Sequence, residues 1–168
     1  MRRLFLPLFI ALAATALAFI ALSAGALPER VASHFGPGGV ANGWMTRGGY
    51  LAIVALGAAL LPLLAVVLIS ALPRAFPRLA NIPNRDYWFA PERQEATLAT
   101  LDGFGWAFAL LLTLFFAGMH WTILDANASV PPRLAEAPVH GLVIGFAILL
   151  AAWIVTLLVR FRRISGGR

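Results

Sequence analysis

The chain contains no cysteine and no lysine, and all of its 13 basic residues are arginine. Without cysteine it can form no disulfide, no thiolate nucleophile and no cysteine-ligated zinc or haem site. These absences remove a large group of redox, metal and covalent chemistries before any motif is considered.

Charge is also scarce, at 12% of 168 residues, while 61% are hydrophobic and the mean hydropathy is +0.85. One soluble domain of this size cannot bury so much apolar surface, so most of the chain is expected to lie in a lipid bilayer. Each of four uncharged runs reaches the ~20 residues that a helix needs to cross a membrane. We therefore predict an all-α integral membrane protein, a single domain over 1–168, with spans at about 4–27, 48–72, 103–124 and 138–160.

The interiors of these runs hold no aspartate, glutamate or arginine. Ion transporters and pumps place such groups at mid-membrane, so a transport role is not favoured. We also find no nucleophile and base pair, phosphate-binding loop or acidic metal motif, so we expect neither an enzyme nor a bound cofactor.

Arginine placement predicts the orientation, because cytoplasmic flanks of spans collect positive charge. Only Arg30, Arg47 and Arg133 would face outward if both termini are cytoplasmic. The opposite side would hold Arg2, Arg3, Arg74, Arg78, Arg85, Arg93, Arg160, Arg162, Arg163 and Arg168. The pI near 11.5 then reflects topology, and no nucleic-acid partner is expected. The first run can be read as an uncleaved helix or as a secretory signal, and both readings place the next segment outside.

The outer loop at 27–44 has the composition of a small hairpin. Pro37-Gly38 suits the centre of a type II turn, Asn42-Gly43 suits a second turn with positive φ, and the segment 31–35 before them is strand-like. Phe35, Trp44 and Tyr50 are expected at the lipid–water boundary, where aromatic rings are favoured.

The same loop carries a family resemblance in Leu27-Pro28, Ser33-His34-Phe35, Asn42-Gly43-Trp44 and Arg47. This pattern resembles the N-terminal module, a domain of unknown function, of SdpI-like bacterial membrane proteins, and covers about 1–50. It departs from that module at Ala32, which is usually proline, and at Asn42, which is often aspartate. The resemblance implies a bacterial inner-membrane protein, with an immunity or signalling role as the associated function.

The second informative segment is the expected cytoplasmic loop between the second and third spans, which we call the inner loop. Pro91, followed by Glu92 and Glu95, predicts a helix that starts near Pro91 and lies along the headgroups before the third span turns off at Gly103 or Gly105. Its aromatic and basic side chains suit either membrane anchoring or docking of a protein partner on 81–101. The docking candidates are Asn84, Arg85, Tyr87, Trp88 and Arg93.

All three histidines, His34, His120 and His140, fall on the outer side. Imidazoles with a nearby carboxylate form a zinc ligand set, and Gly141-x-x-x-Gly145 would allow close helix approach beside His140. The leading hypothesis is a non-enzymatic, SdpI-like immunity or signalling factor that docks a partner through 81–101. The alternative is an outer-face metal-binding or pH-sensing protein that uses the three histidines.

Overall fold

Four long helices dominate the computed structural model, which describes residues 2–163. They are α1 (Arg2–Ser23), α2 (Arg47–Val66), α5 (Gln94–Asn127) and α6 (Glu136–Arg162). Each belongs to a helical stretch that is long and apolar enough to cross a membrane, with α2 extended to Ala75. The predicted four-helix architecture of a multi-pass membrane protein is confirmed.

Shorter elements join these helices. They are η1 (Ala24–Ala26), β1 (Arg30–Phe35), η2 (Pro37–Gly39), β2 (Ala41–Thr46), η3 (Val67–Ala71), α3 (Leu72–Ala75), η4 (Pro77–Leu79) and α4 (Arg85–Trp88). η3 is a π-helical turn that continues α2 into α3.

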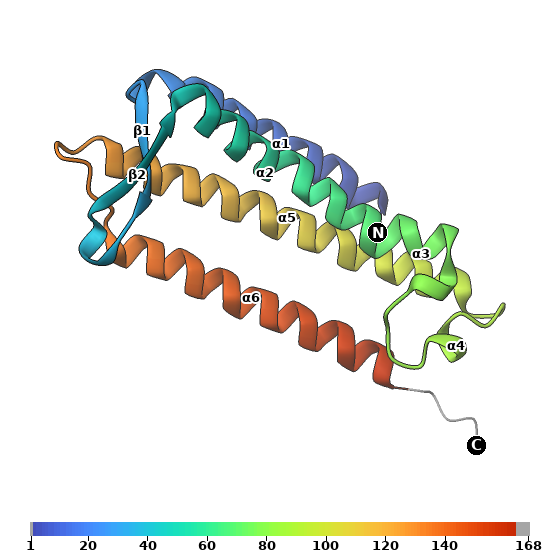
Figure 1. Ribbon diagram of the computed structural model, residues 1–168. Helices are drawn as coiled ribbons and strands as arrows, with labels where there is room; N and C mark the ends of the chain where they lie inside the picture. The colour runs from blue at the N-terminus through green and yellow to red at the C-terminus, as the bar shows by residue number, and fades with distance from the viewer. Residues whose placement is uncertain (1, 164–168) are drawn as a thin grey trace.

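Helix α5 is the centre of the bundle. It lies between the α1–α2 pair and α6, and it packs against all three (Figure 1). The larger buried clusters join α1, α2 and α5, whereas the most apolar 18-residue stretch of α6 has none of its residues buried. Helix α6 is therefore a peripheral helix held mainly by α5, with most of its surface open.

Pro62 lies inside α2, and the backbone carbonyl that it leaves without a hydrogen bond finds a donor on a neighbouring helix. Proline has no N–H, so the carbonyl oxygen of Ala58 loses the partner that a regular helix would supply. The Thr113 hydroxyl of α5 lies 3.1 Å from that oxygen and 3.0 Å from Ala109 O of its own helix, so the two carbonyls share its one proton. An interhelical hydrogen bond thus accommodates the proline in an apolar setting where water is not available.

Strands β1 and β2 form the expected antiparallel hairpin. The chain reverses at Gly38 and Gly39, whose φ angles are +73° and +71°, and Gly38 matches the predicted turn position. The second predicted turn is wrong: Asn42 and Gly43 are extended residues inside β2. Gly43 pairs with His34 of β1, and Asn42 lies at an irregularity of the strand pairing, so the chain reverses only once.

The hairpin lies across one end of the bundle (Figure 1). The side-chain amide of Asn127 donates to Ala32 O at 3.0 Å and accepts from Ala32 N at 2.9 Å, so it pairs with the edge of β1. At the hairpin tip, the Leu134 amide donates to Gly39 O at 2.9 Å. The hairpin is therefore fastened to the last residue of α5 and to the connection between α5 and α6.

The inner loop differs from the prediction. Residues 91–93 form a turn, α5 begins at Gln94, and it continues as one helix through Gly103 and Gly105. The described residues 91–101 therefore form no separate surface helix, because Leu98 and Leu101 are buried in the bundle as part of α5.

The beginning of α1 and the end of α6 lie at the same end of the bundle, opposite the hairpin (Figure 1). The loop from α3 to α5 is also at that end. The side chains of Arg2 and Arg3 and the whole of Arg168, which enter the orientation argument, lie outside the described residues.

Candidate functional site

Three polar side chains meet near the hairpin end of the bundle, one from each of α1, α2 and α5. His120 is 0% exposed, and its Nε2 lies 2.8 Å from Ser23 Oγ, while its Nδ1 lies 2.9 Å from the Tyr50 hydroxyl. We call Ser23, Tyr50 and His120 the outer cluster.

The hydrogen-bond directions in the outer cluster follow from its partners. Ser23 donates its single hydroxyl proton to Phe19 O at 2.6 Å, so its oxygen accepts from Nε2–H of His120. His120 Nδ1 then accepts from the Tyr50 hydroxyl. With the Phe19 ring edge-on and the Tyr50 ring stacked, at 5.1 and 5.7 Å, the imidazole is enclosed on all sides. A neutral, fully bonded histidine therefore ties three helices together.

The three histidines of the metal hypothesis are not brought together. His34 is exposed on β1 and pairs with Ser33 at 3.0 Å, His140 is exposed on α6, and His120 is enclosed as described above. Residues 2–163 contain no group of three histidine, cysteine or acidic side chains that could hold a metal ion. The geometry gives the metal hypothesis no support, and His120 serves the packing of the helices.

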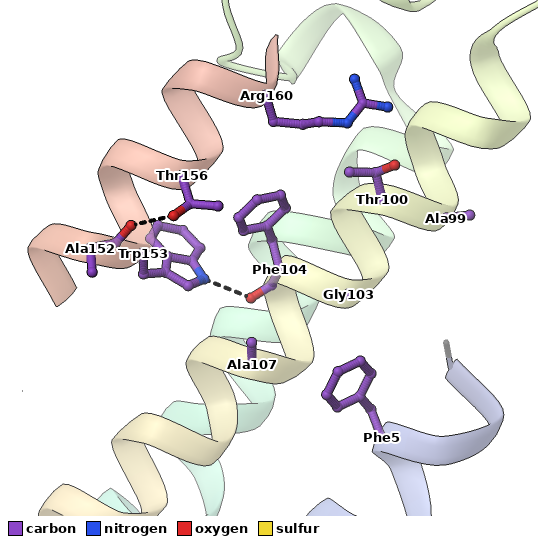
Figure 2. Close-up of a pocket in the computed structure, with 10 residues that line it drawn as sticks. All are labelled: Phe5, Ala99, Thr100, Gly103, Phe104, Ala107, Ala152, Trp153, Thr156 and Arg160. Atoms are coloured by element: carbon purple, nitrogen blue, oxygen red, sulfur yellow. Dashed lines mark hydrogen bonds between the residues drawn. The ribbon is translucent and has the colours of Figure 1, made fainter. Parts of the chain in front are cut away.

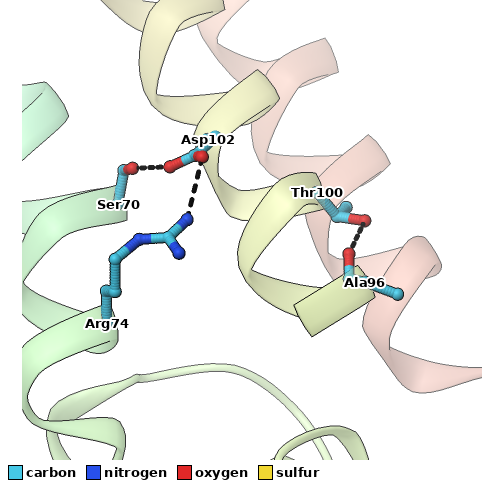
Figure 3. A network of polar contacts seen from close by, with 5 residues as sticks. All are labelled: Ser70, Arg74, Ala96, Thr100 and Asp102. Carbon is cyan, nitrogen blue, oxygen red and sulfur yellow. Dashed lines mark hydrogen bonds and ion pairs between the residues drawn. The ribbon is translucent and has the colours of Figure 1, made fainter. Parts of the chain in front are cut away.

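A second polar group lies towards the other end of α5. Ser70 donates to one carboxylate oxygen of Asp102, and Arg74 donates to the other at 3.0 Å (Figure 3). Asp102 is buried, so both of its carboxylate oxygens depend on these donors. We call Ser70, Arg74 and Asp102 the inner cluster.

The spacing in the sequence contains part of this information. Ser70 and Arg74 are four residues apart and therefore share one helix face, which is the signal that could have indicated a common partner. The inner and outer clusters are 18 residues apart along α5, or about 27 Å at ~1.5 Å per residue. The two clusters thus connect α5 to its neighbours near opposite ends of the spans.

The inner loop is fastened to the end of α6. The indole N–H of Trp88 donates to Phe161 O at 2.7 Å, and the side-chain amide of Asn84 donates to the Phe161 and Arg162 carbonyls, both at 3.2 Å. The last carbonyls of a helix have no partner within it, so these bonds satisfy the C-terminus of α6. We call Asn84, Trp88 and Phe161 the loop clamp.

Apolar packing between the inner loop, α5 and α6 also stabilises the loop clamp. Phe161 and Trp88 are both buried and cross edge-to-face at 5.5 Å, with Leu101 of α5 in the same cluster. Thr97 of α5 also donates to Trp88 O at 2.8 Å. Trp88 is therefore an internal contact of the loop and does not form an exposed anchor.

The other predicted docking residues are partly engaged within the loop. Arg93 donates to Tyr87 O at 2.9 Å, and its guanidinium carbon lies 4.0 Å from the centroid of the Tyr87 ring. Arg85 donates to Arg78 O at 3.0 Å and pairs with Asp86 at 2.9 Å; the Arg85 side chain is 41% exposed and that of Asp86 is 90% exposed. Of the five candidates, Asn84 and Trp88 shape the loop, whereas Arg85 remains partly exposed.

An apolar groove of about 690 Å³ runs beside α6. Its walls come from Phe5 of α1, from Gly103, Phe104 and Ala107 of α5, and from Ala152 and Trp153 of α6, with Arg160 at its end (Figure 2). The Trp153 indole N–H donates to Phe104 O at 3.0 Å, which fixes the ring as a wall. We call this space the α6 groove.

The two glycines of the predicted close-approach motif do not serve that purpose within the described chain. A side chain added at Gly141 or Gly145 would meet no atom within 4 Å. Both glycines line a smaller cavity of about 220 Å³ between α5 and α6. The space beside them is open, so they do not bring α6 close to α5.

Together these features define a helical multi-pass membrane protein with a three-helix core, a peripheral fourth helix and a clamped inner loop. Residues 9–58 match the model of a family described as a domain of unknown function, DUF1648. The match covers part of α1, the hairpin and part of α2, and so includes Ser23 and Tyr50 but not His120. No curated protein and no solved structure matches the chain.

Proposed function

We propose that this chain is a non-enzymatic protein of a bacterial inner membrane, with both termini in the cytoplasm. The arginine distribution supports this orientation. Arg74, Arg78, Arg85, Arg93 and Arg160 all belong to elements at the end that carries the inner loop. Because positive flanks stay on the cytoplasmic side, that end is assigned to the cytoplasm.

The non-enzymatic assignment is supported by the outer cluster. Ser23 and His120 have the spacing of a nucleophile and its base, at 2.8 Å. The imidazole, however, has no exposed surface, and the serine proton already bonds to its own helix. A substrate has no access to this pair, so a packing role accounts for it.

Within that membrane we infer an SdpI-like immunity or signalling role, in which a protein partner docks on the cytoplasmic segment predicted at 81–101. Residues 94–101 belong to α5, so we assign the docking surface to the inner loop, residues 76–93. The observation that carries this proposal is the loop clamp, which holds the loop in one conformation against α6. Phe76 and Leu79 remain 59% and 60% exposed on this ordered loop, which also carries the partly exposed Arg85. Exposed apolar and arginine side chains on a preformed surface are typical of protein interfaces.

A photoreactive amino acid at Asp86, whose side chain is 90% exposed, tests the docking role in cells. We expect it to cross-link one specific protein, whereas the same probe at Val130, on the hairpin side of the bundle, should not. The Trp88→Ala variant opens the clamp and should abolish the adduct. If probes at Asp86 and Leu79 capture only lipid, the docking proposal is wrong.

The orientation has its own test. A reporter that is active only in the cytoplasm, fused to the C-terminus, should be active, and the same reporter inserted at Val130 should be silent. The reverse pattern would contradict the assignment of the inner loop to the cytoplasm and would leave the helix packing unchanged.

A further inference from the structure

The α6 groove continues into a second, basic space. A neighbouring cavity of about 520 Å³ shares Thr156 and Arg160 with it and is also lined by Trp88, Val159 and Arg163. An apolar channel along the helices therefore opens, at the inner-loop end, onto two arginines. An amphiphile with a negatively charged head would fit both spaces, because its apolar chain suits the groove and its head suits the arginines.

Arg160 is positioned to receive an anion. Its guanidinium carbon lies 4.7 Å from the centroid of the Trp88 ring, so the tryptophan covers one face of the group. Among the described side chains, no carboxylate lies within 4.0 Å of it. No hydrogen bond from its N–H donors to a described residue is found, and guanidinium donors match phosphate oxygens. The positive charge thus lacks an acidic partner within the described chain.

The groove is elongated along the helices. From Ala99 to Ala107 it follows α5 for about 12 Å, at ~1.5 Å per residue. The groove offers about 690 Å³, which lies in the range of small-molecule pockets. A slender chain fits this volume, and a chain in the bilayer reaches the groove from the side.

We propose that the α6 groove and the adjoining basic cavity bind one anionic phospholipid. An acyl chain lies along Phe104 and Trp153, and the phosphate lies at Arg160 and Arg163. The proposal rests on the four helices spanning a membrane, and it is independent of any protein partner of the inner loop.

The test uses the purified full chain in a neutral detergent and measures phospholipid binding by native mass spectrometry. Phosphatidylglycerol should bind more tightly than phosphatidylcholine with the same acyl chains. Arg160→Gln should weaken phosphatidylglycerol about fivefold, as expected for loss of one arginine contact to an anionic headgroup. Arg162→Gln is the matched control, because this exposed arginine lines neither cavity.

A second pair of variants tests the predicted contact of the acyl chain with the groove. Ala152→Leu places a larger side chain in the groove and should weaken phosphatidylglycerol binding, whereas Ala151→Leu, one residue away and outside the groove, should not. Melting temperatures of the four variants identify any loss that is caused by unfolding. Equal binding by the two arginine variants would overturn the proposal. The proposal would also be overturned if inorganic phosphate competed fully with phosphatidylglycerol and Ala152→Leu had no effect on binding. That result would identify a site for a free anion.

Discussion

Replacing Tyr50 with phenylalanine tests the outer cluster with the smallest change available. The variant loses the hydroxyl that donates to His120 Nδ1 at 2.9 Å and keeps the ring that stacks on the imidazole at 5.7 Å. Hydrogen bonds between membrane helices contribute about 0.6 kcal/mol on average and up to ~1.7 kcal/mol. Here the deletion also leaves a fully buried nitrogen without its partner, so we expect a loss of about 1–2 kcal/mol in the free energy of unfolding.

A double-mutant cycle separates this bond from general packing. His120→Ala removes both hydrogen bonds and both ring contacts and should cost about 3 kcal/mol. In that background Tyr50→Phe has no acceptor to lose, so it should cost little, which gives a coupling energy of about 1 kcal/mol. Thr156→Val is the control: its hydroxyl bonds to Ala152 O of its own helix at 2.7 Å, so its effect should add to that of Tyr50→Phe.

The measurement is reversible unfolding in mixed micelles, followed by circular dichroism as the denaturing detergent is increased. The reasoning is refuted if Tyr50→Phe costs as much in the His120→Ala background as in the wild type. That result would mean that the hydroxyl stabilises the fold through some contact other than the imidazole.

Three further outcomes are expected. Arg74→Gln leaves the buried Asp102 carboxylate with a hydroxyl as its only donor among the described side chains and should lower the unfolding free energy by about 1–3 kcal/mol in the same titration. Gly39→Ala should destabilise the hairpin more than Gly38→Ala, because both have positive φ but only the first would meet the neighbouring backbone; melting temperatures check the order. Trp88→Phe keeps an aromatic ring but loses its bond to the last turn of α6, so limited proteolysis should cut the inner loop faster than in the wild type.

The spans could be read from the sequence because each one is a property of a continuous stretch. The second was expected at 48–72 and the helical stretch observed is Arg47–Ala75; the fourth was expected at 138–160 and is Glu136–Arg162. Length and apolarity are local quantities, so one stretch carries enough information. The third helix begins before the expected 103, because Leu98 and Leu101 find buried positions that only the assembled bundle offers.

Of the two turns predicted from residue type, one is present and the other is absent, because tertiary contacts again decide the outcome. Gly38 has the positive φ that the predicted turn requires, whereas Asn42-Gly43, an equally good turn sequence, is extended. A single reversal already supplies the hairpin, and Gly43 pairs with His34 of β1 while Asn42 lies at an irregularity of the ladder. Strand pairing therefore outweighs the local preference for a second turn.

The amino-acid sequence by itself determined that this protein has four apolar helices and a hairpin between the first two, since hydrophobic length and turn residues act over neighbouring positions. Tertiary structure alone decided the partners of the polar side chains: His120 meets Ser23 across 97 positions and Tyr50 across 70, and Trp88 reaches Phe161 across 73. In an apolar surrounding a buried donor or acceptor must find a partner wherever the helices bring one within reach. That requirement depends on how the helices pack, so a local spacing such as that of Ser70 and Arg74 can suggest a shared helix face but cannot identify the partner.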